Sequence, residues 1–316
     1  MIYVSIPVHE KPEVIVNQMQ NFARYLPEAK VVLHVSKGAK FSTNELEDFL
    51  KEANTSNTLI NPTQVETKWG SIIQAHLANI RYIIQQGDAE KVVFHSSNDM
   101  LIMDGLSEYL KDKKNIFHLR KCTSDSLWWV SRRAMEDSFI ISFFKGYIYA
   151  SQIEGSMYDI RLLECLLHNI DKQLLILENE KNYPKEEVVF SSFAYKNNIN
   201  PDGLPYIYSE VHDFDRKLFR CFEINKFFAN GNFFVARLFR WILSNLLTFF
   251  NNQNISIAVI ESIINREYPI KQFLTLNDGS EEWIIYNKDF IFGVKRVKRD
   301  LNDLVRVFIS EKYFKE

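Results

Sequence analysis

The chain has 316 residues, of which 46% are hydrophobic and 25% are charged, as in an ordinary globular protein. Its formal net charge of −2 gives no global argument for nucleic acid or for an anionic membrane as a partner. Three widely spaced cysteines argue against a disulfide framework and against a zinc site. The first residues lack a basic region followed by a long apolar run, so we predict no signal peptide and expect a cytoplasmic protein.

Strand-like and helix-like patterns alternate from residue 2 to residue 119. Strands are predicted at 2–8, 30–35, 58–60, 91–95 and 116–119, and Pro7 is expected to end the first of them. Helices are predicted between them at 12–25, 43–53, 71–86 and 104–112. This order predicts an α/β fold with a mainly parallel sheet and helices on both faces.

The strand predicted at 91–95 is apolar along most of its length and stops at the polar run Ser96-Ser97-Asn98-Asp99. In open α/β sheets, ligands bind just beyond the carboxyl ends of such strands, so this run is the first candidate for a site. The sequence contains neither GxGxxG nor GxxxxGK[ST]. That absence weakens a dinucleotide-binding fold and argues against a P-loop NTPase.

The second half of the chain is less regular. An amphipathic helix is predicted at 157–170, and a helix that begins near Pro184 would place Glu186 and Glu187 in its first turn. The other predicted elements are a helix from residue 132, strands at 174–177, 282–286 and 290–294, a loop at 200–216, and a final helix at 301–312. A basic run, Lys295 to Arg299, precedes that helix.

Residues 217–250 are rich in phenylalanine and leucine, and their charges are mostly basic. Arg237 and Arg240 interrupt the apolar runs, so the segment is too short and too charged to span a bilayer. It can be a helical pair packed on the sheet domain, which we favour, or a segment that lies on a membrane surface.

Six segments, in this order between residues 3 and 299, together resemble the core-2/I-branching glycosyltransferase family, which includes branching N-acetylglucosaminyltransferases and peptide O-xylosyltransferases. The segments read LHVSKGAK, VETKWGSIIQAHLANIRYII, VVFHSSNDMLIMDG, LWWVSRRAMED, EVVFSSF and FGVKR. The resemblance implies a GT-A-like (Rossmann-like) α/β fold. It also implies inverting transfer from a nucleotide sugar without an obligatory metal.

Such a transfer needs a carboxylate that takes the proton of the acceptor hydroxyl, and a positive group that stabilises the departing diphosphate. The resemblance assigns the catalytic base to Glu187, with Glu186 as the fallback because a slip of one residue is open. It assigns the diphosphate to Lys295 and Arg296, in preference to Lys298 and Arg299.

The remaining candidates follow from the same motifs and from their places at strand ends. The candidate donor-binding residues are His9, Ser36, Trp69, Gly70 and Asp99, and the candidate acceptor-binding residues are Trp128, Trp129 and Glu154. Ser36 stands where the family usually has aspartate, and of the family's Gly-Gln-Asp triplet only Asp99 remains. No metal and no cofactor are expected.

The expected protein is therefore a glycosyltransferase that uses a UDP-sugar and a glycan or lipid-linked glycan acceptor, with no nucleic-acid partner. It would be cytoplasmic, with possible contact at the inner face of the plasma membrane. The expected organisation is a GT-A-like domain at 1–210, a helical insertion at 211–275 and a returning segment at 276–316. Two alternatives stay open: a non-catalytic glycan- or nucleotide-binding protein, and a metal-dependent enzyme that uses Asp213 and Asp215.

Overall fold

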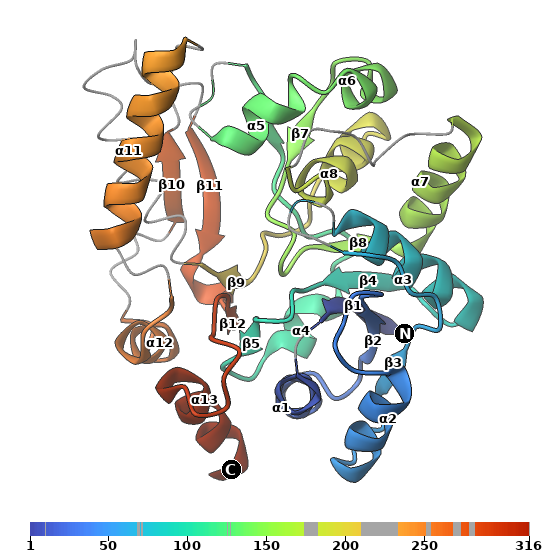
Figure 1. The fold of residues 1–316 in the computed structure, drawn as a ribbon. Coiled ribbons are helices and arrows are strands. Elements are labelled where there is room, and N and C mark those ends of the chain that lie inside the picture. Colours follow the sequence, from blue (N-terminus) through green and yellow to red (C-terminus); the bar gives the residue numbers. More distant parts are fainter. Residues whose placement is uncertain are drawn as a thin grey trace.

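The computed structural model describes residues 1–9, 11–67, 70, 72–124, 126, 128–173, 183–209, 233–250, 254–267, 273–277 and 282–315. In this part of the chain, the central sheet has the strand order β3-β2-β1-β4-β8 (Figure 1). The strands are β1 (Ile2–Val8), β2 (Lys30–Val35), β3 (Thr58–Ile60), β4 (Lys91–Phe94) and β8 (Met157–Asp159). The first four run parallel and β8 runs antiparallel to β4, which confirms the predicted mainly parallel sheet.

Helices cover both faces of this sheet. Helices α1 (Pro12–Tyr25) and α2 (Thr43–Glu52) pack with Val4, Ile6 and Val8 on one face. Helices α3 (Ile73–Gln86), α7 (Ile160–Gln173) and α8 (Glu186–Lys196) pack on the other face, where β1 contributes Tyr3. Successive side chains of a strand point to opposite faces, so the apolar strand β1 contributes side chains to the hydrophobic core on both faces of the sheet.

Pro7 does not end β1, contrary to the prediction, because the strand continues to Val8. The carbonyl of Val8 accepts from Ser36 on the β2 side, and the carbonyl of Ser5 accepts from His95 on the β4 side. Alternation along the strand therefore turns Pro7 toward β4, where β4 has already ended at Phe94. A proline without an N–H is tolerated there because no ladder bond is required of it.

Two predictions between residues 116 and 170 are wrong. Residues 116–119 form no strand: Ile116 makes isolated bridges to Met157 and Gly203, and the backbone N–H of His118 donates to the Ser151 hydroxyl instead. The helix expected to begin at 157 begins at Ile160, because Met157 to Asp159 pair with β4 as an edge strand.

The remaining elements connect the sheet to the C-terminal part of the chain. β12 (Gly293–Val294) pairs with β5 (Met100–Leu101) and with β9 (Ile207–Tyr208), so late residues lie beside the end of β4. The other described elements are α4 (Leu106–Lys111), β6 (Arg120–Lys121), α5 (Trp129–Ala134), α6 (Ser138–Phe144), β7 (Tyr149–Ala150), α11 (Phe234–Phe250), α12 (Ile257–Ile264), β10 (Phe273–Asn277), β11 (Glu282–Asn287), η1 (Lys288–Phe290) and α13 (Leu304–Lys315). The strand predicted at 174–177 lies outside the described residues.

Replacing Lys91 by methionine is expected to lower the free energy of unfolding by roughly 3 kcal/mol. The buried ammonium donates to the carbonyls of Leu110, Lys111 and Lys113 at 2.9, 2.8 and 2.7 Å, at the end of α4. Methionine fills the space and leaves these three carbonyls without that donor. Urea unfolding measures the loss, and the exposed Lys111→Met is the control, with an expected change within about 0.5 kcal/mol. Equal effects of the two substitutions would contradict this role of Lys91.

Candidate functional site

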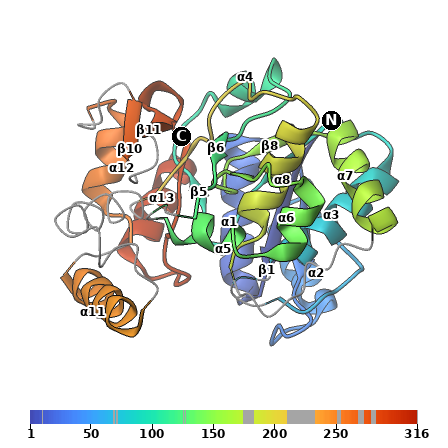
Figure 2. The same ribbon diagram turned by 90° about the horizontal axis from the view of Figure 1, so that it is seen from above.

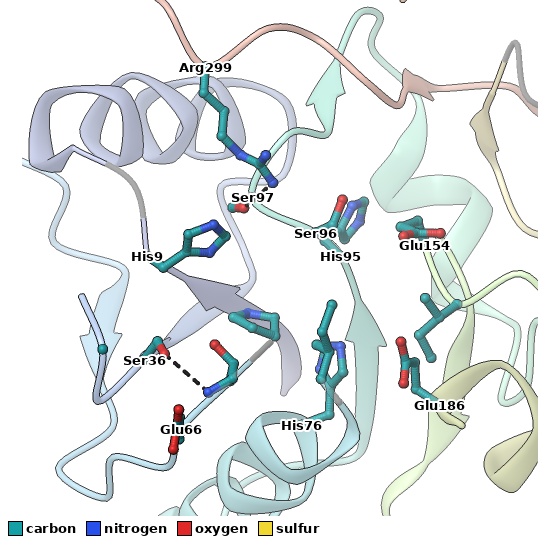
Figure 3. Close-up of a pocket in the computed structure, with 15 residues that line it drawn as sticks. His9, Ser36, Glu66, His76, His95, Ser96, Ser97, Glu154, Glu186 and Arg299 are labelled. Carbon is teal, nitrogen blue, oxygen red and sulfur yellow. Dashed lines mark hydrogen bonds between the residues drawn. The ribbon is translucent and has the colours of Figure 1, made fainter. Parts of the chain in front are cut away.

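A cavity of about 400 Å³ opens between the carboxyl ends of β1 and β4 (Figure 3). The chain passes from β1 to β2 and β3 on one side of β1, then crosses to β4 on its other side. The loops after β1 and β4 therefore diverge, and such a switch point is where open α/β sheets bind ligands. Pro7 and His9 from the end of β1, and His95, Ser96 and Ser97 from the end of β4, line this β1/β4 cavity.

One wall of the cavity follows β2 and β3. Ser36, Gly38, Glu66 and Thr67 line it, and Figure 3 shows Ser36 and Glu66 on the same side of the opening. The Ser36 hydroxyl accepts from the backbone N–H of Thr67 at 3.2 Å, which ties the two loops together. Hydroxyl, backbone and carboxylate groups on a strand-end wall can hydrogen-bond to a nucleoside.

The loop after β4 is held in shape by Asp99. Its buried carboxylate accepts from the backbone N–H of Ser96 at 2.9 Å and from the Ser96 hydroxyl at 2.7 Å. The same carboxylate lies 3.1 Å from His95 Nδ1, and His95 Nε2 lies 2.7 Å from the Tyr206 hydroxyl. Asp99 is fully buried and is not among the described residues that line the cavity. It therefore shapes the site from beneath, and the residues that reach the cavity are His95, Ser96 and Ser97.

The wall opposite Ser36 carries two buried carboxyl groups, Glu154 and Glu186, which Figure 3 shows on one side of the cavity. They are 5% and 4% exposed, and Oε2 of each is buried without a hydrogen-bond partner among the described residues. Burial raises the pKa of Glu186 to about 7, and the charge of Glu154 adds to this effect. The backbone N–H of Glu186 and the cation of Lys295 oppose the rise.

Local hydrogen bonds fix the position of Glu186. The prediction that Glu186 and Glu187 open a helix is confirmed by α8. The hydroxyls of Ser191 and Ser192 both donate to the carbonyl of Tyr149, at 2.9 and 2.8 Å. The carbonyl of Glu187 accepts from the backbone N–H of Ser151 at 2.7 Å. These bonds hold the first two turns of α8 against β7 and the loop that follows it, which carries Glu154.

That loop turns at Gly155, whose φ is +78°. A Cβ at this position would lie 3.0 Å from backbone nitrogens of Tyr206 and Ile207, so a side chain does not fit. The turn therefore depends on glycine for both its conformation and its space. It leads Glu154 into the cavity, where its Oε1 accepts from Lys295 Nζ at 2.5 Å.

Lys295 lies behind Glu154 and is not among the described lining residues of the cavity. Burial opposes the charge of the ammonium, but Glu154, Asp99 and Glu187 outweigh burial and raise the pKa of Lys295. Lys295 is thus a permanent cation that holds Glu154. Among the described lysines and arginines, Arg299 lines the cavity; it donates to the Ser97 hydroxyl at 3.0 Å and appears beside His9 in Figure 3.

Other predicted residues lie elsewhere. Glu187, half-buried, and Arg296, with a φ of +67°, are not among the described residues that line the cavity. Trp128 stacks beneath the Arg120 guanidinium at 4.7 Å and packs on the hydrophobic core, and Trp129 is 36% exposed at the start of α5. Trp128, Trp129 and Gly70 are not among the described residues that line the cavity. Trp69 lies outside the described residues.

Within the described ranges, no group of three or more histidine, cysteine, aspartate or glutamate side chains is arranged to hold a metal ion. Asp213 and Asp215 lie outside those ranges. Metal-independence therefore stays a prediction.

The sequence offered only faint signals for three lining residues. His76 is a lone histidine on the apolar face of α3; burial lowers its pKa to about 3, and its Nδ1 lies 2.9 Å from the Ser5 hydroxyl. Glu66 stands just before the tryptophan motif, and Arg299 belongs to the basic run. His76 and Glu66 could be singled out only once the loops were placed, whereas the sequence makes Arg299 a phosphate candidate that ranks below Lys295 and Arg296.

A scan against models of protein families finds no match, and a search of curated proteins finds none either. Among solved structures, a crystal structure of an active-site mutant of LgtC is similar over 66% of this chain and 72% of that chain. The TM-score is 0.37 and the sequence identity is 9%. A likeness of this size carries no argument about function, which has to be inferred from the β1/β4 cavity itself.

Proposed function

We propose that this protein is an inverting glycosyltransferase that moves a sugar from a nucleotide donor, a UDP-sugar in the first instance, to a glycan hydroxyl. The observation that carries the proposal is Glu186. It is a buried carboxyl group with an unpartnered oxygen and a pKa near 7, and it faces a cavity at the switch point of an α/β sheet. Such a group is suited to accept a proton at neutral pH.

The arrangement of the walls supports a nucleotide sugar as the ligand. The volume of about 400 Å³ falls within the range of ligand pockets. Ser36 and Glu66 offer acceptors for a nucleoside on one side, and Arg299 with Ser97 offers donors for a diphosphate at the rim. Glu154 and Glu186 lie across the cavity from Ser36 (Figure 3), and the proposal places the sugar and the acceptor beside them.

The chemistry is a single displacement. The acceptor oxygen attacks the anomeric carbon while its proton passes to the Glu186 carboxylate, and the bond from that carbon to the diphosphate oxygen breaks. Arg299 stabilises the negative charge that develops on the diphosphate. Glu154, held through Oε1 by Lys295, can accept a hydrogen bond from a hydroxyl of the sugar through its other oxygen. The proposal therefore gives the base to Glu186, the phosphate contact to Arg299, and a positioning role to Lys295.

Binding of nucleotide sugars tests the proposal most directly. We expect a UDP-sugar, and UDP itself, to raise the melting temperature in a concentration-dependent way, because a ligand of the native state alone stabilises it. In the presence of an acceptor oligosaccharide, UDP release measured by a coupled assay is expected to accompany sugar transfer. Stabilisation by UDP without any release in a broad acceptor screen would favour the non-catalytic alternative. Stabilisation by neither UDP-sugars nor other nucleotide sugars would contradict the proposal.

A further inference from the structure

Helix α11 exposes an unusual amount of apolar surface. It has 17 residues, and Phe234, Trp241 and Leu246 are 70%, 65% and 50% exposed. The most exposed apolar side chains of α11 are Phe234, Val235, Leu238, Trp241, Ile242 and Leu246. Figures 1 and 2 both show α11 at the outer edge of the molecule, away from the central sheet. Of the helical pair predicted at 217–250, the structure describes α11, and residues 217–232 lie outside the described residues, so the prediction of a packed pair stays a prediction.

Exposed apolar side chains cover one broad face of the helix, which also carries the exposed Asn245. Ala236 is fully buried and marks the side that packs on the protein. At about 100° per residue, Phe234, Leu238 and Trp241 lie within roughly 40° of the direction opposite Ala236. Arg237 is exposed and lies about 80° from that direction, at the border of the apolar face. A wide apolar face with arginine at its border is the pattern of a helix that lies in a membrane interface.

The charge of α11 matches an anionic surface. Residues 234–250 contain Arg237 and Arg240 and no aspartate or glutamate, although the whole chain carries a net charge of −2. Arginine near the border of an apolar face can reach lipid phosphates while its stem stays in the apolar layer. Among the described helices, none combines the length and the apolar character that a bilayer crossing requires. The helix would therefore lie flat.

The size of the face argues against a second copy of the chain as its partner. A helix of 17 residues is roughly 25 Å long and 10 Å wide, so its exposed face covers an area of about 250 Å². This area is well under half of the ~800 Å² that each partner buries in a stable complex. A lipid surface needs no such complementary area, because each side chain inserts independently. We propose that α11 binds the protein to the surface of an anionic phospholipid bilayer, with Phe234, Leu238 and Trp241 inserted and Arg237 at the headgroups.

Co-sedimentation with vesicles tests this proposal independently of any enzymatic activity. We expect the full chain to bind vesicles of phosphatidylcholine mixed with phosphatidylglycerol, and to bind vesicles of phosphatidylcholine alone more weakly. Leu238→Glu and Trp241→Glu should each weaken binding about tenfold or more, because a buried apolar contact is replaced by a charge. Arg237→Gln should reduce the preference for phosphatidylglycerol. Phe139→Glu, at a 43% exposed position on α6, is the matched control and should bind as the wild type does.

Two further measurements keep the proposal falsifiable. Vesicles should shift the tryptophan emission to shorter wavelength, and Trp241→Phe should lose most of that shift while the protein still sediments. A protein that ignores both kinds of vesicle overturns the proposal. A dimer in light scattering that Leu238→Glu dissociates, without vesicle binding, overturns it in favour of a second copy. Protection of Trp241 from acrylamide without vesicles, again with no vesicle binding, would show that another part of the chain covers the helix.

Discussion

Replacing Glu186 by glutamine is expected to lower the rate of sugar transfer by about 10²–10⁴-fold, the contribution typical of a positioned general base. Glutamine preserves the size and one oxygen of the side chain but cannot take the acceptor proton. Donor binding should persist, because Glu186 lies across the cavity from the Ser36 wall (Figure 3). Steady-state UDP release measures the loss, and UDP-induced thermal stabilisation checks that the donor site is intact.

The same substitution is expected to stabilise the protein at alkaline pH. Burial raises the pKa of Glu186 from 4.5 to about 7, so the native state favours the protonated form. That preference is fully satisfied below about pH 4.5 and is lost as pH rises through about 7. Above that pH, the ionised carboxyl costs up to roughly 3 kcal/mol, which glutamine removes. Urea unfolding of both proteins at pH 5 and at pH 8 should show a gain for Glu186→Gln that grows with pH.

Activity of the wild type should rise with pH through about 7, since the base must be ionised. Glu187→Gln is the comparison, because the resemblance assigns the catalytic base to Glu187, whereas Glu186 is the residue that lines the cavity. It should keep most of the activity and the pH dependence of the wild type. Loss of activity in Glu187→Gln, with a nearly normal Glu186→Gln, would return the base to Glu187.

Replacing Lys295 by methionine is expected to cost roughly 2 kcal/mol of stability at neutral pH, because it removes the ammonium from a pair in which Glu154 is buried and Lys295 is 21% exposed. It leaves Glu154 buried without its counter-ion. Lys298→Met removes a 58% exposed lysine from its pair with Asp303 and should change stability by at most about 1 kcal/mol.

Kinetics of Lys295→Met separate two roles for this lysine. Lys295 lowers the pKa of Glu186, so its removal should move the rise of activity to higher pH. A contact to the diphosphate, as the resemblance implies, would instead raise KM for the donor and leave the pH midpoint in place. A variant as stable as the wild type, with an unchanged pH profile, would show that the Glu154–Lys295 pair has neither effect.

The first half of the fold could be predicted because its signals are local. β1, α1, β2, α2 and β3 follow periodicity and caps, such as Ser42, whose hydroxyl accepts from the Glu45 N–H at 3.1 Å. β8 could not be predicted in this way, because its three residues become a strand only by pairing with β4. Residues 116–119 show the opposite case, in which a strand-like sequence forms no strand. Their apolar pattern predicts a strand, but only Ile116 forms bridges to other segments.

The sequence predicted which loops form the site, but not which side chains of those loops face the cavity. One cavity does bring together His9, Ser36 and Glu154 with Ser96 and Ser97 from the run after β4, whereas Asp99 of that run lies beneath it. Glu186 and Glu187 differ by one position, and one helical step of about 100° decides which of them faces that cavity. Arg299 reaches the cavity although Arg296 does not, because the chain between them runs irregularly after β12. Periodicity in sequence carries no information about such a turn.

The place of β1 in the middle of the sheet sets an order of assembly on the ribosome. β2 and β3 are complete by residue 60, but β4 begins only at residue 91 and β8 only at residue 157. The backbone groups on the edge of β1 that later pairs with β4 therefore stay unpaired while the intervening chain is synthesised. Nascent chains that stop before β4 would carry an open apolar strand edge, the feature from which misassembly starts. Of the strands in the central sheet, β1 is translated first, and we expect it to depend longest on protection by the chaperones that bind nascent chains.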